Sequence, residues 1–341
     1  MAASIEPLVT PARLLQFAWG FAVPLMIDAA VRRRLFDALD RGPKTAAALA
    51  AETGIFERGA RAVLNALTSV ELLSKDPEGR YSLTPESALF LVSAKPSFLG
   101  GVFRHASVDL IPRWLALNEI VRTGAPARDV DGAAGGAAHF HGFVEDIFPL
   151  SYPAARALAD ALVSEAGDAP LRALDVAAGA GVWGVALAQR SPRVRVTAVD
   201  WPQQVLDATR RVARRFGVDD RLETRAGDLF EVDFGGDYQI ATLGHILHSF
   251  GPSRSRALLA KVRQALAPGG VIVIAEFLVD EARAAQTNAL IFAVNMLVNT
   301  EEGDAYSFSE IAGWLKEAGF ENVRTMAAPG PAPLILANRA G

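Results

Sequence analysis

A glycine-rich turn between an apolar run and an expected helix constrains the fold of this chain more than any other segment. The turn lies in the sequence LDVAAGAGVWG, residues 174–184. Gly179 and Gly181 lack a Cβ atom, so the backbone there can turn sharply and approach a ligand closely. A strand, a glycine turn and a helix in this order are typical of an α/β sheet that binds a nucleotide-like ligand at the ends of its strands.

Two kinds of ligand fit this turn. The spacing Gly179-x-Gly181-x-x-Gly184, with Asp200 ending the next apolar run as a candidate ribose ligand, matches the dinucleotide fingerprint. It also matches the loop that binds S-adenosylmethionine (SAM) in Rossmann-like methyltransferases. Asp175 lies four residues before the first glycine. Its carboxylate suits the sulfonium and amino group of SAM better than a pyrophosphate. The residues therefore favour SAM, and NAD is the alternative.

The second half of the chain alternates between apolar runs and amphipathic segments, which predicts alternating strands and helices. The expected strands are residues 171–177, 194–199, 221–226, 238–244 and 271–277. The expected helices are residues 181–190, 202–216, 253–267, 286–298 and 308–318. Two last runs, 322–328 and 334–338, predict an antiparallel hairpin. This order predicts an α/β, Rossmann-like, mostly parallel sheet with right-handed crossovers, closed by a C-terminal hairpin that is typical of methyltransferases.

Residues 1–100 predict a mainly helical domain with a short β-wing. Thr45 is the expected N-cap of one helix, a second is expected from Glu57 to Leu73, and Lys75–Leu83 predicts a hairpin. This order resembles a winged helix, so a DNA-binding regulator is an alternative function. Residues 41–80 carry six Lys or Arg and five Asp or Glu. That balance argues against a surface that faces phosphates and favours a packing scaffold.

Charge and composition exclude several classes of protein. The net charge of -4 argues against nucleic-acid binding, and the lack of cysteine excludes disulfides and thiolate metal sites. The most apolar early run, residues 17–27, is too short to span a bilayer and contains Gly20 and Pro24. We therefore expect a cytoplasmic protein with neither nucleic acid nor a membrane among its partners.

Two further strand ends carry candidate site residues. Asp228 follows the third expected strand, where it can accept a hydrogen bond from an adenine amino group while Phe230 packs on the ring. The alternative is that Asp228 only caps its own turn. His248 follows the fourth expected strand, and a neutral imidazole there can take a proton from a substrate hydroxyl. Glu276, after the fifth, can fix the tautomer of His248.

A metal site is a second interpretation of the same region. His245, His248 and Glu276 form a set of two histidines and one carboxylate, a set that binds transition metals in other proteins. Because the spacing places no further ligand beside them, we expect no metal here. Activity that is lost on addition of a chelator would favour the metal interpretation.

These motifs together resemble the two-domain SAM-dependent O-methyltransferases, which include plant caffeic acid and hydroxyindole O-methyltransferases and many bacterial secondary-metabolite enzymes. The family's glycine loop is similar to residues 174–181, and its two adenosine acids match Asp200 and Asp228. Its Leu-His-Asp-Trp segment is similar to residues 247–250, and the acid after the following strand matches Glu276. The resemblance covers nearly the whole chain.

The resemblance implies a homodimeric enzyme that transfers a methyl group from SAM to a hydroxyl of a small aromatic or polyketide-like acceptor. His248 is then the general base and Glu276 orients it. Methylation of carbon is the alternative within this class. The implied domains are a winged-helix dimerisation domain at 1–100, connecting helices that line the acceptor pocket at 101–165, and a SAM-binding domain at 166–341.

Two positions depart from the family's pattern. Its lysine four residues before the catalytic histidine is Gly244 here. Its second acid beside the histidine falls near Ala305, so that either Glu301, Glu302 or Asp304 serves in its place or no residue does.

Overall fold

The computed structural model describes residues 9–127, 143–165, 167, 169–330 and 332–341. The chain forms two compact units, Met1–Ile111 and Pro112–Gly341. The three-part division at residues 100 and 165 remains a prediction. The sequence also predicts a loop over the glycine-rich residues 122–138, of which 128–138 lie outside the described residues. The preceding helix ends at Thr123, and Gly124 after it has a left-handed backbone at φ 75°.

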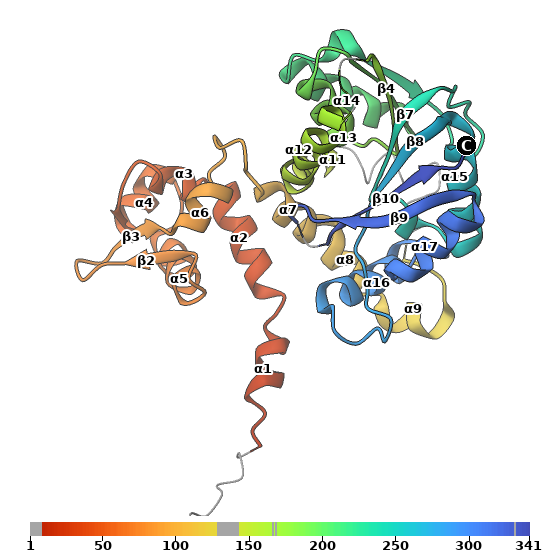
Figure 1. Ribbon diagram of the computed structural model, residues 1–341. Coiled ribbons are helices and arrows are strands. Elements are labelled where there is room, and N and C mark those ends of the chain that lie inside the picture. Colours follow the sequence, from red (N-terminus) through yellow and green to blue (C-terminus); the bar gives the residue numbers. More distant parts are fainter. Residues whose placement is uncertain (1–8, 128–142, 166, 168, 331) are drawn as a thin grey trace, which may run out of the picture. The chain divides into compact units, whose positions relative to one another are not determined.

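The first unit is helical with a small antiparallel sheet of order β1-β3-β2 (Figure 1). Its strands are β1 (Lys44–Thr45), β2 (Leu73–Lys75) and β3 (Arg80–Leu83). Its helices are α1 (Ala12–Ala18), α2 (Ala22–Arg32), α3 (Leu35–Leu39), α4 (Ala46–Thr53), α5 (Glu57–Ser69), α6 (Pro85–Phe90), α7 (Gly100–His105) and the π-helical turn η1 (Ala106–Leu110). The predicted β-wing is therefore present as β2 and β3, with β1 as a third strand.

Local signals fix the helix boundaries of this unit. The Thr45 hydroxyl accepts a hydrogen bond from the Ala48 N–H at 3.2 Å, which confirms the predicted N-cap of α4. The prediction that the next helix continues to Leu73 was wrong, because α5 ends at Ser69. Leu73 is buried and pairs with Leu83 across the hairpin. Burial in the sheet outweighs the helical periodicity of that stretch.

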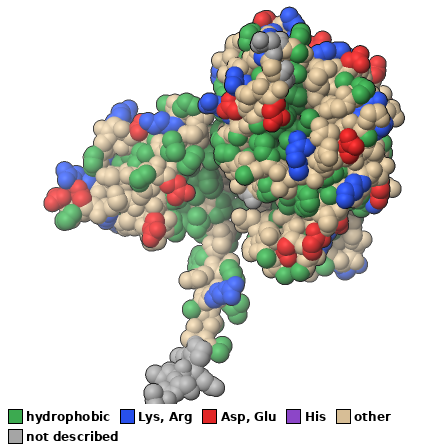
Figure 2. All heavy atoms as spheres, viewed as in Figure 1, with side chains coloured by type: hydrophobic (Ala, Val, Ile, Leu, Met, Phe, Trp, Pro, Cys, Tyr) green, Lys and Arg blue, Asp and Glu red, His purple; other side chains and the backbone are tan. Residues whose placement is uncertain are grey.

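Helix α1 contributes no buried residue. Its hydrophobic side chains and those just after it are exposed, with Leu14 at 70% and Trp19 at 69% (Figure 2). Among the described residues, no single helix is long and apolar enough to cross a membrane. The bent pair α1 and α2 passes that test together, by length and composition only.

The second unit is built on a seven-stranded sheet of order β6-β5-β4-β7-β8-β10-β9 (Figure 1). The strands are β4 (Leu171–Val176), β5 (Val194–Asp200), β6 (Leu222–Ala226), β7 (Tyr238–Gly244), β8 (Leu266–Ala275), β9 (Phe320–Met326) and β10 (Leu334–Arg339). Strands β4 to β8 pair in parallel, and β10 is antiparallel to both β8 and β9. The predicted parallel sheet with a C-terminal hairpin is confirmed.

Helices pack on both faces of this sheet: α12 (Phe148–Glu165), α13 (Val182–Arg190) and α14 (Gln203–Arg215) on one, and α15 (Pro252–Ala265) and α17 (Phe308–Glu317) on the other. The other helices from Ile111 onward are α8 (Ile111–Trp114), α9 (Leu117–Thr123), α11 (Phe143–Asp146) and α16 (Thr287–Asn299). Alternate residues of β4 point to opposite faces. Ala173 packs in a core with α12, α13 and α14, and Leu174 packs in a second core with α15 and α17. Burial on both faces explains why the strands are continuous apolar runs.

Candidate active site

The predicted glycine turn lies at the carboxyl end of β4 and is fixed by its neighbours. Gly179 and Gly181 both have left-handed backbones, at φ 54° and 77°, which favour glycine. The Gly179 N–H donates to Asp200 Oδ2 at 2.7 Å, and the Gly179 carbonyl accepts from the Thr209 hydroxyl at 2.6 Å. A Cβ atom on Gly181 would lie 2.7 Å from Thr209 Cγ2. The turn is therefore preformed, and it has no room for a side chain at Gly181.

Asp200 ends β5 and is partly exposed beside this turn. Its Oδ1 accepts from the Trp201 N–H at 2.6 Å, while Oδ2 accepts from Gly179. Burial raises the pKa of Asp200 to about 6, although the two N–H donors oppose that shift. Each carboxylate oxygen has a further lone pair, so Asp200 can also accept hydrogen bonds from a ribose diol.

The raised pKa of Asp200 predicts that cofactor binding weakens in mild acid. We expect Asp200 to bind the ribose, and because an ionised carboxylate only accepts hydrogen bonds and can take both ribose hydroxyls, binding should favour the deprotonated form. Affinity should be full above the pKa of about 6 and fall below it. The expected loss is about tenfold per pH unit below that pKa. Calorimetry with S-adenosylhomocysteine between pH 4.5 and 7.5 measures it. Asp200→Asn should abolish the slope, and an unchanged slope in that variant would assign it to another group.

Asp175 is held by the protein's own donors. It is 1% exposed, its Oδ2 accepts from the Gly184 N–H at 2.9 Å, and its Oδ1 accepts from the Thr242 hydroxyl at 2.8 Å. Burial raises the pKa of Asp175 to about 7; these two hydrogen bonds oppose that shift, and the nearby charge of Asp200 adds to it. Asp175 therefore joins β4, β7 and the start of α13. Its contact with the charged end of SAM stays a prediction.

Asp228 and Phe230 lie after β6, and their observed contacts are local. Asp228 is exposed, and its Oδ1 accepts from the Phe230 N–H at 2.7 Å, so it caps its own turn. The Phe230 ring meets Phe250 edge-on at 5.1 Å, and Arg254 Cζ lies 4.5 Å from both ring centres. These contacts fix the aromatic ring near the strand ends. The adenine contacts of Asp228 and Phe230 stay predictions.

The structure brings His248 and Glu276 together as the sequence predicts. His248 lies in the 3₁₀ turn η3 (Leu247–Ser249) after β7, and Glu276 directly follows the neighbouring strand β8. His248 Nδ1 and Glu276 Oε2 are 2.7 Å apart, and the His248 N–H donates to Glu276 Oε1 at 3.3 Å. Burial works to raise the pKa of Glu276, but the adjacent imidazole and these hydrogen bonds outweigh it and lower that pKa. Glu276 is therefore a carboxylate at neutral pH.

His245 stands beside this pair. Its backbone is left-handed at φ 60°, and its buried Nδ1 has no hydrogen-bond partner among the described residues. Burial lowers the pKa of His245, so its imidazole is neutral at pH 7. One ligand atom from each of His245, His248 and Glu276 lies within 4.8 Å of the others. That geometry fits a metal ion, but the carboxylate oxygen is already bonded to His248. The expectation of no metal stays a prediction.

Two phenylalanine rings lie beside the His248 ring. Phe292 of α16 meets the His248 ring edge-on at 4.8 Å, and Phe277 packs on Phe292 at 4.2 Å.

Trp183, in the first turn of α13, is buried against Gly244. A Cβ atom at position 244 would overlap the Trp183 indole nitrogen. Gly244 stands where the family has lysine, because the Trp183 ring leaves no room for a side chain there. Sequence analysis missed this role of Trp183 and the anchoring hydroxyls of Thr209 and Thr242.

A sheet of this topology, with its glycine turn held by an acid at the next strand end, has the architecture of SAM-binding methyltransferases. Family models agree. Residues 161–321 match the O-methyltransferase domain, and residues 15–93 match the O-methyltransferase dimerisation domain.

Individual relatives match along nearly their whole length. The 3-hydroxy-5-methyl-1-naphthoate 3-O-methyltransferase of Streptomyces sahachiroi is 34% identical, over 94% of this chain and 93% of its own. The tetracenomycin polyketide synthesis 8-O-methyl transferase TcmO of Streptomyces glaucescens is 30% identical, over 96% and 97%. The structure of PigF with SAH (S-adenosylhomocysteine), a SAM-dependent methyl transferase of Serratia sp., superposes with a TM-score of 0.83 at 26% identity, over 97% and 100%. The chain therefore belongs to the O-methyltransferase family and is a SAM-dependent enzyme, which decides between SAM and NAD in favour of SAM.

Proposed function

We propose that this O-methyltransferase methylates a hydroxyl of a small aromatic or polyketide-like acceptor, with His248 as the general base and Glu276 as the residue that orients it. The 2.7 Å contact between His248 Nδ1 and Glu276 Oε2 carries this proposal. A buried carboxylate on Nδ1 holds the proton there, which leaves the lone pair of a neutral imidazole on Nε2.

The chemistry of the pair suits proton removal from a phenol. SAM supplies a methyl group on a cationic sulfur when it is bound. His248 Nε2 takes the hydroxyl proton, so the O–H bonding pair stays on the acceptor oxygen and is available for the new C–O bond. Transfer of the methyl group would then break its bond to sulfur, and S-adenosylhomocysteine would leave with that electron pair. A phenol has a pKa of about 10, so it needs such a base at neutral pH. Glu276 stabilises the imidazolium that forms, and the proton then leaves to solvent.

The acceptor class is supported by the surroundings of His248 and by the relatives. Phe292 and Phe277 offer apolar ring surface directly beside the imidazole. The relatives from S. sahachiroi and S. glaucescens are named for a naphthoate and for tetracenomycin polyketide synthesis. A carbon acceptor remains the second candidate, because a histidine beside a bound ketone can also remove a proton from carbon.

The test is a screen of phenols and keto acids with methyl-labelled SAM. A methoxy product from phenols supports the proposal, and a C-methyl product from keto acids supports the alternative; carbon-13 chemical shifts distinguish the two.

The same assay after treatment with EDTA examines the metal interpretation. Activity should be unchanged, and loss of activity that returns with added metal would contradict the expectation of no metal.

We further propose that the chain acts as a homodimer and that α1 takes part in its interface. The match to the dimerisation domain starts at residue 15, within α1, where the hydrophobic side chains of Leu15 and Phe17 are exposed. Charges there should split the dimer, so we expect Leu15→Glu/Phe17→Glu to run as a monomer in light scattering. Val121→Glu, at another exposed apolar position, should stay dimeric. A dimer that survives the double substitution would remove α1 from the interface.

A further inference from the structure

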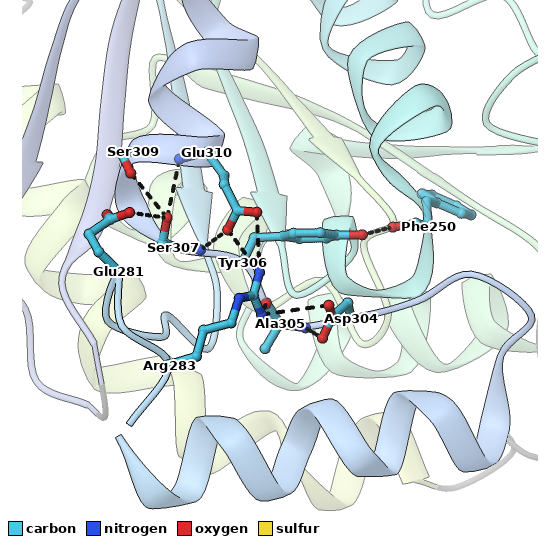
Figure 3. Close-up of polar contacts among 9 residues, drawn as sticks. All are labelled: Phe250, Glu281, Arg283, Asp304, Ala305, Tyr306, Ser307, Ser309 and Glu310. Carbon is cyan, nitrogen blue, oxygen red and sulfur yellow. Dashed lines mark hydrogen bonds and ion pairs between the residues drawn. The ribbon is translucent and has the colours of Figure 1, made fainter. Parts of the chain in front are cut away.

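The turn that carries His248 is attached to a second segment that the proposed mechanism does not use. The Asp304 N–H donates to the His248 carbonyl at 3.0 Å. The hydroxyl of Tyr306, which is 4% exposed, donates to the Phe250 carbonyl at 2.6 Å (Figure 3). Both bonds reach the backbone of the turn η3 and the residue after it. We call residues 303–306 the brace.

Gly303 sets the distance between the brace and the histidine. A Cβ atom at Gly303 would overlap the His248 carbonyl oxygen and the Thr300 hydroxyl. That hydroxyl accepts from the Gly303 N–H at 2.9 Å and donates to the Met296 carbonyl at 2.7 Å, so it ties the brace to the end of α16. Any side chain at position 303 must therefore move the backbone that holds His248.

The far side of the brace is anchored by Arg283. Its Nη1 donates to the Ala305 carbonyl at 2.8 Å, and its Nη2 contacts Glu310 Oε2 at 3.1 Å (Figure 3). Glu310 also accepts from the Ser307 N–H at 2.8 Å in the capping box that starts α17. The brace is thus fixed to α17 on one side and to the histidine turn on the other.

The acidic side chains near the brace are directed elsewhere. The Asp304 carboxylate accepts from the Ala305 N–H at 2.8 Å and pairs with Arg283 Nη1 at 3.6 Å (Figure 3). Glu301 and Glu302 are exposed, and the Glu302 carboxylate lies against Gly251. Among the bonds of the described residues, Asp304 contacts His248 through its backbone N–H and not through its carboxylate.

We propose that the brace, through Gly303, the Asp304 N–H and the Tyr306 hydroxyl, is a positioning element that sets where the His248 ring lies. This inference rests on the proposed function of His248. Glu276 holds the ring nitrogen and the brace holds the main chain of the same residue, so the imidazole is fixed from two sides. An enzyme built this way orders its base without a second carboxylate on the ring.

The test compares two glycine-to-alanine substitutions. Gly303→Ala should lower kcat at least tenfold, because displacing a catalytic group by about 1 Å costs on the order of 100-fold in rate. The KM for SAM should stay within about twofold, since the brace does not form the cofactor turn. Gly313→Ala is the matched control, because nothing lies within 4 Å of a Cβ atom there. The control should keep the kcat of the unmodified protein.

Tyr306→Phe is the second variant, and it keeps the test open if Gly303→Ala does not fold. It removes the hydroxyl and its one hydrogen bond but keeps the aromatic ring, so we expect kcat to fall about three- to tenfold. In both variants the nitrogen-15 shifts of the His248 imidazole should move, which a purely structural role would not require. A kcat equal to that of Gly313→Ala, with unmoved imidazole shifts, would overturn the brace. If His248→Ala is itself active, the base assignment fails and the brace can be judged by the imidazole shifts alone.

Discussion

His248→Ala should lose about 100- to 10,000-fold in kcat on a simple phenol, because removal of a general base costs that much. Binding of SAM should change little, since the histidine lies after β7 and the cofactor turn lies after β4. The measurement is steady-state turnover together with calorimetric SAM binding on the same preparation. Glu276→Gln should have a smaller effect, because an amide can still hold the ring but cannot stabilise its positive charge.

The acceptor's own acidity provides the control for this prediction. A phenol that is already ionised at the assay pH needs no base, so the gap between variant and unmodified protein should close as acceptor pKa falls below about 7. If the gap stays constant across acceptors, His248 acts by position or packing. If activity stays within about threefold on every acceptor, His248 is not the base.

Asp200→Ala should raise the Kd for SAM about 100-fold or more. The substitution removes the carboxylate that holds the Gly179 and Trp201 N–H groups and that we expect to bind the ribose. Hydrogen bonds to a charged group contribute about 1.5 to 3 kcal/mol each, and about 1.4 kcal/mol is a factor of ten. Calorimetry with SAM and S-adenosylhomocysteine measures the loss, which should be similar for both because the ribose is common to them.

Asp207→Ala is the matched control for Asp200→Ala. Asp207 lies nearby on α14, but it is exposed and pairs with Arg210 at 2.9 Å on the surface. Its removal should leave the Kd unchanged. A Kd within about threefold of the unmodified protein for Asp200→Ala would show that the ribose is bound elsewhere.

The topology was predictable because its signals are periodic and local. Apolar runs alternate with amphipathic segments, so the parallel strands and the closing hairpin follow from the sequence. The ends of elements were harder to place. The sequence also predicts a helix over residues 156–163, but α12 begins at Phe148, eight residues earlier, even though Pro153 lies inside it. Tertiary packing on α13 outweighs the low helix propensity of proline there.

The candidate site was predictable to the level of strand ends and not to the level of contacts. His248 and Glu276 follow adjacent parallel strands, so their meeting could be inferred from order alone. Asp175 shows the limit. Its sequence position indicates a free charge near the ligand, whereas the structure buries it and raises its pKa to about 7. Whether a carboxylate faces solvent depends on donors far along the chain, such as Thr242, which no local pattern reveals.

The contact between Trp183 and Gly244 has a consequence for how such enzymes diverge. A large ring at the start of α13 occupies the space that any side chain on residue 244 would need. The two positions are therefore expected to change together: a lineage that acquires lysine at 244 must first shrink or turn the residue at 183. Sequences of family members should therefore not combine tryptophan at position 183 with a long side chain at position 244.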